Sequence, residues 1–154
     1  MDPKNIKRIL VPTDFSESSA EAVSTAVAFA RGFGATLELV HVFTDPVYPL
    51  PAPLEVVALP VDVERIYTEV ENLLAGEAQR VRAAEVPCEH NILNGRPHVE
   101  IVRHADETKA NLIVVGTHGR SGIGHAILGS VAERVVHRAH CPVLVVPLHR
   151  AKKS

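Results

Sequence analysis

Three glycines and a serine near the end of the chain have the types and spacing that suit phosphate binding. Gly116 and Gly119 are separated by two residues, and nine further residues precede Gly129 and Ser130. Glycines let a backbone approach a ligand closely, and a helix start offers unpaired N–H groups at the positive end of its dipole. The pattern predicts a phosphate-binding loop, although such glycines are also typical of turns and helix caps.

The elements around this loop are predicted by apolar patterns. Residues 112–115 form a short apolar run, typical of a strand buried on both faces, and residues 143–146 form another. Between them, apolar residues recur at helical spacing from residue 128 to residue 139. Ser130 and Glu133 have capping-box spacing, which predicts Ser130 as the N-cap. The expected order is strand, glycine-rich loop, helix, strand.

The loop differs from two common phosphate-binding motifs but resembles a third. It has neither the Gly-Lys-Ser/Thr of a Walker loop nor the closely spaced G-x-G-x-x-G of dinucleotide folds. The spacing G-x2-G-x9-G-S resembles the universal stress protein family, in its ATP-binding branch. The start of the chain, Lys-Arg-Ile-Leu-Val-Pro-Thr-Asp-Phe-Ser at residues 7–16, is similar to that family's first strand and loop. The resemblance therefore extends over nearly the whole chain.

Composition limits the class of protein. The 154 residues suit one domain, expected over residues 1–148 with a polar tail at 149–154. Sixteen Lys and Arg against eighteen Asp and Glu give a net charge of -2, so a nucleic-acid partner is not expected. The two cysteines lack CxxC spacing, and the sequence shows no signal peptide or membrane-spanning apolar run. We expect a cytoplasmic protein with no membrane association.

The rest of the chain predicts strands alternating with helices. A first strand at 9–11 precedes a helix capped by Asp14 or Ser16 and ended by Gly32 and Gly34. The remaining expectations are a strand at 36–43, a helix at 62–84 with a solvated charged face, a strand at 88–93 and a helix starting at Pro97. This alternation predicts a single doubly wound α/β domain with a five-stranded parallel sheet and helices on both faces. The family resemblance implies the strand order 3-2-1-4-5.

The segment 44–60 contains five prolines and is predicted to be irregular. It is either a plain surface connection or a lid over a ligand.

Ligands of such sheets bind beyond the carboxyl ends of the strands where the strand order reverses, here between the first and fourth strands. Asp14 suits ribose hydroxyls, or is a helix cap alone. Arg120 suits a phosphate, or is an ordinary exposed arginine. The resemblance implies an adenine-nucleotide site comprising Pro12, Thr13, Asp14, Val42, Val115, Gly116, Gly119, Arg120, Gly129, Ser130 and Val131.

Nine histidines raise the question of metal binding or catalysis. Neither an HExxH motif nor a clear ligand cluster is present, so we expect no protein metal site, and Mg²⁺ is expected only with the phosphates of ATP. His118 could orient water near a terminal phosphate, but no catalytic set stands out.

We therefore predict an ATP-binding stress-response protein that acts as a regulatory or protective module. The alternatives are a slow ATP hydrolase or nucleotidyl-transfer enzyme, an interaction module without nucleotide, and a flavin-binding protein, which six aromatic residues disfavour. The apolar last strand, 142–147, is expected at a sheet edge, where the resemblance implies pairing with a second copy into a homodimer. A further, unidentified protein partner is also expected to read the bound state.

Overall fold

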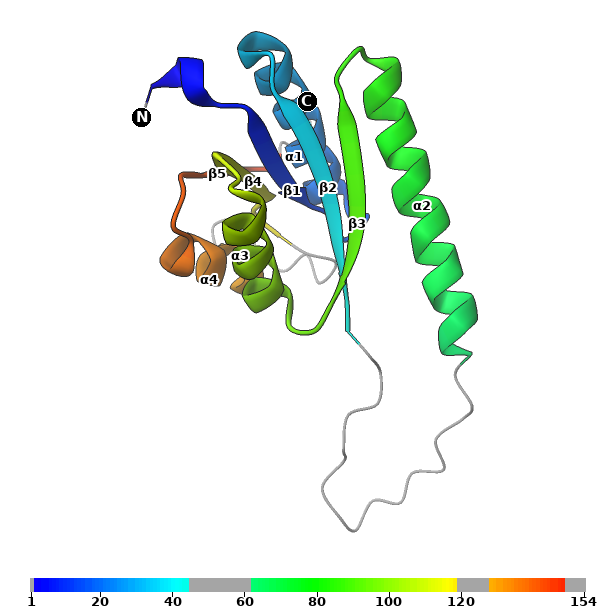
Figure 1. Cartoon of the computed structure of the whole chain (residues 1–154). Helices are drawn as coiled ribbons and strands as arrows, with labels where there is room; N and C mark the ends of the chain where they lie inside the picture. Colours follow the sequence, from blue (N-terminus) through cyan, green and yellow to red (C-terminus); the bar gives the residue numbers. More distant parts are fainter. Residues whose placement is uncertain (1, 45–61, 119–127, 149–154) are drawn as a thin grey trace, which may run out of the picture.

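The computed structural model describes residues 2–44, 62–118 and 128–148. Within these ranges a five-stranded parallel sheet alternates with four α-helices (Figure 1). The elements are a 3₁₀ turn at Pro3–Asn5, β1 Arg8–Pro12, α1 Glu17–Phe33, β2 Thr36–Phe43, α2 Val63–Ala83, β3 Cys88–Asn94, α3 Pro97–Thr108, β4 Leu112–Gly116, α4 Ser130–Arg138 and β5 Val143–Val146. The segment 44–60 lies almost entirely outside the described residues, so the choice between lid and surface connection stays open.

The strand order is β3-β2-β1-β4-β5, and every pairing is parallel. This confirms the predicted fold class and the order that the family resemblance implied. Ile9 of β1 pairs with Leu37 of β2 on one side and with Leu112 of β4 on the other. Strands β2 and β3 therefore lie on one side of β1, and β4 and β5 lie on the other. The point where the strand order reverses therefore lies between β1 and β4, as expected.

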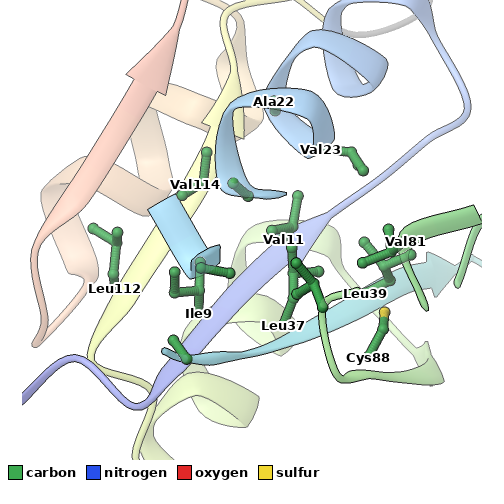
Figure 2. Packing of buried hydrophobic residues seen from close by; sticks show 14 of the residues in the cluster. Ile9, Val11, Ala22, Val23, Leu37, Leu39, Val81, Cys88, Leu112 and Val114 are labelled. Atoms are coloured by element: carbon green, nitrogen blue, oxygen red, sulfur yellow. The ribbon is translucent and has the colours of Figure 1, made fainter. Parts of the chain in front are cut away.

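Alternate residues of the strands supply two separate cores. Ile9, Val11, Leu37 and Leu39 face α1 and α2 and are almost completely buried there (Figure 2). The opposite face carries residues of the other parity and packs against α3 and α4; it comprises Leu10, Val40, Leu93, Ile113 and Val115 with Ile101, Ala105, Ala132 and Val135. Burial on both faces explains why the inner strands read as continuous apolar runs.

Strand β5 is less buried than its sequence predicts. Val143, Leu144 and Val145 are half-buried, and Val146 is buried. The reason is its place in the sheet, because β5 pairs only with β4 and forms an edge. The expected edge position is confirmed, and its apolar side chains are left partly accessible.

A buried polar cluster lies on the α3 side of β2. Glu38 is 1% exposed. Its carboxylate lies 2.8 Å from Arg8 Nη1, 2.6 Å from His104 Nε2 and 2.9 Å from Asn91 Nδ2. Burial alone would raise the pKa of this carboxyl, but the hydrogen bonds from His104, Asn91 and Arg8 together hold it below its ordinary value.

The ends of α1 follow from its sequence. Ser16 is the N-cap, and its hydroxyl accepts a hydrogen bond from Ser19 N at 3.2 Å. Gly34 ends the helix in the left-handed conformation, at φ 65°. Gly32, expected to help end the helix, instead lies inside it.

Candidate functional site

A cavity of about 270 Å³ lies at the carboxyl ends of β1, β2 and β4. Its described walls are Pro12, Thr13, Asp14, His41, Val42, Pro97, Ile101, Val115, Gly116, Thr117, His118, Gly129, Ser130, Val131 and Ala132. The volume is close to the lower end of small-molecule sites, about 300 Å³. The cavity occupies the point where the strand order reverses, which is where doubly wound sheets bind ligands.

Nine of the eleven residues predicted for the site line this one cavity. The other two, Gly119 and Arg120, lie outside the described residues. The predicted set of eleven did not include His41, Pro97, Ile101, Thr117, His118 or Ala132, although His118 was considered as a group that could orient water. Thr117 and His118 follow β4 directly, and their position between two expected glycines was a usable signal. Pro97 and Ile101 belong to α3, which no local pattern connects to the cavity.

The turn after β1 is held by hydrogen bonds to Thr13. Its backbone N–H donates to Val40 O at 2.8 Å, and His41 Nδ1 lies 2.8 Å from its carbonyl oxygen. Its side-chain oxygen accepts from Phe15 N at 3.1 Å. Phe15 has φ 64°, an uncommon conformation for a residue other than glycine, and its ring stacks on His41 at a centroid distance of 5.0 Å. The turn is therefore fixed from several sides.

Asp14 lies in this turn, on the cavity wall. Its Oδ1 accepts a hydrogen bond from Ser16 N at 3.0 Å, which closes the turn locally. The α1 cap itself is Ser16, so the prediction that Asp14 or Ser16 caps the helix is resolved in favour of Ser16. The Asp14 carboxylate adds negative charge to a wall otherwise formed by uncharged residues and two histidines.

Gly116 is required by packing. A Cβ placed on Gly116 would lie 2.5 Å from Ser18 Oγ and 2.6 Å from the Ser18 carbonyl oxygen. The missing Cβ at Gly116 thus makes room for α1, while close approach of its backbone to a ligand stays a prediction. The first turn of α1 occupies that room. The contact joins the two halves of the site, because Ser18 Oγ also accepts from His118 N at 3.1 Å.

The chain after β4 is held in the same way. Thr117 N donates to Val146 O of β5 at 3.1 Å, and Gly129 N donates to Thr117 O at 2.6 Å. His118 Nδ1 lies 2.8 Å from Thr117 Oγ1. His118 Nε2 is buried and has no hydrogen-bond partner among the residues that the structure describes. His118 itself is one of the residues that line the cavity.

The start of α4 differs from its prediction. Gly129 is the N-cap, with extended backbone at φ -60° and ψ 152°, and its carbonyl accepts from Glu133 N at 2.9 Å. Ser130 is the first helical residue and makes no capping hydrogen bond, so the predicted capping box is wrong. Val131, predicted as a site residue, is 38% exposed and lines the cavity. Helix geometry leaves the N–H groups of Ser130, Val131 and Ala132 without an intrahelical acceptor.

The site thus combines apolar walls, one carboxylate and a helix start. Val42, Val115 and Ile101 supply apolar surface on one side, and the positive end of the α4 dipole lies on another. Among the described residues no group of three or more His, Cys, Asp and Glu side chains could hold a metal ion. In the same ranges, no helix has the length and apolar character that crossing a membrane needs.

These features define a class of protein, a doubly wound α/β domain with a ligand cavity at the reversal of strand order. Residues 5–147 match the model of the universal stress protein family, and the chain belongs to that family. Universal stress protein MJ0531 of Methanocaldococcus jannaschii is 39% identical over 149 residues, covering 91% of this chain and 81% of the relative. The solved structure of protein MJ0577 of the same organism has a TM-score of 0.77 at 27% identity, covering 95% of this chain and 99% of that one.

Two further solved structures contain adenine nucleotides. A universal stress protein in complex with cAMP is 28% identical, with a TM-score of 0.69, covering 94% of this chain and 98% of that one. The universal stress protein from Archaeoglobus fulgidus in complex with dAMP is 26% identical, with a TM-score of 0.65, covering 90% of this chain and 96% of that one.

Proposed function

We propose that this protein binds ATP in the cavity between β1 and β4 and acts as a regulatory or protective module in a stress response. The observation that carries the proposal is the convergence of Asp14, apolar strand ends and the α4 start on one cavity. The adenine nucleotides bound by two relatives support the same class of ligand.

The nucleoside half of ATP is assigned to the β1 and β2 side of the cavity. Val42 and the backbone at Pro12 and Thr13 offer a surface on which a flat base can pack. Asp14 accepts hydrogen bonds from ribose hydroxyls, and its carboxylate makes such bonds stronger than a neutral acceptor would. Val115 closes the wall beneath.

The phosphates are assigned to the α4 side. The N–H groups of Ser130, Val131 and Ala132, which have no intrahelical acceptor, point along the helix axis toward the cavity end, where an anion is favoured. His118, which also lines the cavity, is the neighbouring polar residue on this side. Gly119 and Arg120, which lie between these groups in sequence, complete the proposed phosphate contacts.

Mg²⁺ fits this site only together with the nucleotide. Mg²⁺ takes oxygen ligands and is commonly held by one or two carboxylates with substrate phosphates. Asp14 is the one carboxylate among the described cavity walls. The bound ion would neutralise part of the phosphate charge.

The proposed assembly is a homodimer through β5. Its half-buried Val143, Leu144 and Val145 lie on a sheet edge, and pairing with a second copy would cover them. Sedimentation that detects only monomer at micromolar concentration would contradict this part of the proposal. A further protein partner would recognise the nucleotide-bound state of this protein.

The binding proposal is tested by thermal unfolding of nucleotide-stripped protein with ATP and Mg²⁺, with AMP and FMN as comparators. At 100 times the dissociation constant, a one-site ligand adds about 2.7 kcal/mol, which shifts the midpoint by about 5 to 11 °C for a chain of this size. Asp14→Asn should weaken ATP binding about tenfold, because the charged acceptor is lost while the amide oxygen can still accept from Ser16 N. Glu21→Gln, an exposed acid on α1, is the matched control. No shift with any nucleotide would refute the proposal.

A further inference from the structure

A second acid lies behind the candidate site, on the other side of the β1–α1 turn. Glu77 belongs to α2 and is 9% exposed. It borders a separate cavity of about 250 Å³ between α1 and α2. Its Oε2 lies 3.4 Å from Oγ1 of Thr13, whose residue also lines the candidate site. A single hydrogen bond therefore connects this acid to the wall of the nucleotide cavity.

The hydrogen bonds around Thr13 form a chain with a defined direction. Ser19 Oγ donates to the Ser16 carbonyl at 3.0 Å, which uses its only proton. The Thr13 hydroxyl can therefore donate to Ser19 Oγ at 3.1 Å, while Thr13 Oγ1 accepts from Phe15 N. A protonated Glu77 completes the chain by donating to Thr13 Oγ1. An ionised Glu77 only accepts, so it takes the Thr13 proton away from Ser19.

This chain controls the geometry of the turn that carries Asp14. The bond from Phe15 N to Thr13 Oγ1 spans Asp14 directly, and Phe15 is held in its positive-φ conformation on the other side. Thr13 is 4% exposed, so water does not readily replace a missing partner. A change in the partners of the Thr13 hydroxyl is therefore transmitted to the carboxylate in the cavity.

We propose that Glu77 is a positioning residue for this site: through the Thr13 hydroxyl it holds the turn that carries Asp14, and its protonation sets the affinity for nucleotide. This inference rests on the proposed nucleotide binding.

The surroundings of Glu77 decide the direction of the effect. Burial raises the pKa of its carboxyl, and the opposing influences of Arg80 and the Thr13 hydrogen bond are smaller. Arg80 lies on α2 itself and is exposed. Strand β3 places one titratable group, the thiol of Cys88, near Glu77. The α1 residues in the wall of the cavity beside Glu77 are all uncharged. As pH rises through the folded-state pKa, Glu77 becomes ionised. The turn then loses one bond and an anionic ligand gains a negative neighbour, so affinity should fall.

The test measures ATP affinity by calorimetry with excess Mg²⁺ from pH 5 to pH 8, using nucleotide-stripped wild-type protein and Glu77→Gln. The glutamine amide donates to Thr13 Oγ1 at every pH and stays uncharged. We expect the two dissociation constants to converge as pH falls through the Glu77 pKa, and the wild type to bind about three- to tenfold more weakly above it. Because ATP itself gains and loses protons equally in both experiments, the ratio of the two dissociation constants reports only the effect of Glu77.

Two further variants complete the design. Glu71→Gln removes an exposed acid from the same helix and should follow the wild-type pH profile. Glu77→Ala removes the donor and should bind about fivefold more weakly than Glu77→Gln at the lowest pH. If Glu77→Ala fails to fold, the pH dependence of ATP affinity in Glu77→Gln alone tests the positioning role.

A ratio of wild type to Glu77→Gln that stays constant across the pH range would overturn the positioning role and leave nucleotide binding intact. Absence of ATP binding by the wild-type protein would instead overturn the proposed function and this inference together.

Discussion

Gly116→Ala is the perturbation that the structure predicts most directly. The added Cβ would lie 2.5, 2.6 and 2.8 Å from Oγ, the carbonyl oxygen and the carbonyl carbon of Ser18. Rotation of the serine side chain removes only the first of these contacts. The other two involve backbone, so the first turn of α1 must move away from β4.

The expected loss of stability follows from this geometry. Overpacking that displaces backbone typically costs about 1 to 3 kcal/mol. For a domain of this size, that lowers the thermal midpoint by about 2 to 12 °C. Part of any such loss is offset, because alanine restricts the unfolded chain more than glycine does by about 0.4 to 1 kcal/mol.

Gly76→Ala is the matched control. Gly76 lies inside α2, and a Cβ added there meets nothing within 4 Å. Alanine is favoured over glycine in a helix interior by about 0.5 to 1 kcal/mol, so this variant should be more stable than the wild type. Chemical denaturation of the three proteins provides the measurement. If Gly116→Ala were as stable as Gly76→Ala, the packing argument for Gly116 would be refuted.

Two further predictions concern caps and charge. Ser16→Ala should cost about 1 kcal/mol of unfolding free energy, because it removes the hydroxyl that accepts from Ser19 N. Ser130→Ala should change the unfolding free energy by less than about 0.5 kcal/mol, because Ser130 caps nothing. Equal losses for the two variants in urea denaturation would contradict the assignment of Gly129 as the cap. Glu38 has a folded-state pKa below its ordinary value of 4.5, so its contribution is complete above that pH and is lost as pH falls through the folded-state pKa. In urea titrations from pH 7 down to pH 3, the free energy of unfolding should fall less steeply for Glu38→Gln than for the wild type. Parallel plots of unfolding free energy against pH would refute this linkage.

The architecture was predictable because its signals are local or shared with a known family. Most of the strands are short, largely apolar runs, with β3 the more polar exception, and each helix has one apolar face, so element type and order follow from periodicity. The order of strands does not follow from periodicity, and it was predicted from the resemblance. The polar residues after β1 and β4 could be assigned to one crevice because carboxyl ends of parallel strands share an edge.

Two features that the sequence did not reveal depend on contacts between distant parts of the chain. Gly116 is packed against Ser18, nearly a hundred positions away. Glu77 was assigned to the solvated face of its helix, yet it lies three residues after Leu74 and four before Val81, both buried. An acid within an apolar stripe was therefore a usable sign of burial. Ser130 failed for a local reason, because Gly129 met the same capping requirement one residue earlier.

Strand β2 has consequences for how this protein can change over evolutionary time. Its third residue, Glu38, anchors the polar cluster on α3, and its seventh, Val42, lines the cavity. At about 3.3 Å per residue, the two lie roughly 13 Å apart, beyond the range in which substitutions usually interfere with one another. Mutations that alter ligand preference at the carboxyl end of the sheet can therefore accumulate without eroding the ion pairs at its amino end. The same scaffold can diversify its ligands while its folding remains under separate selection.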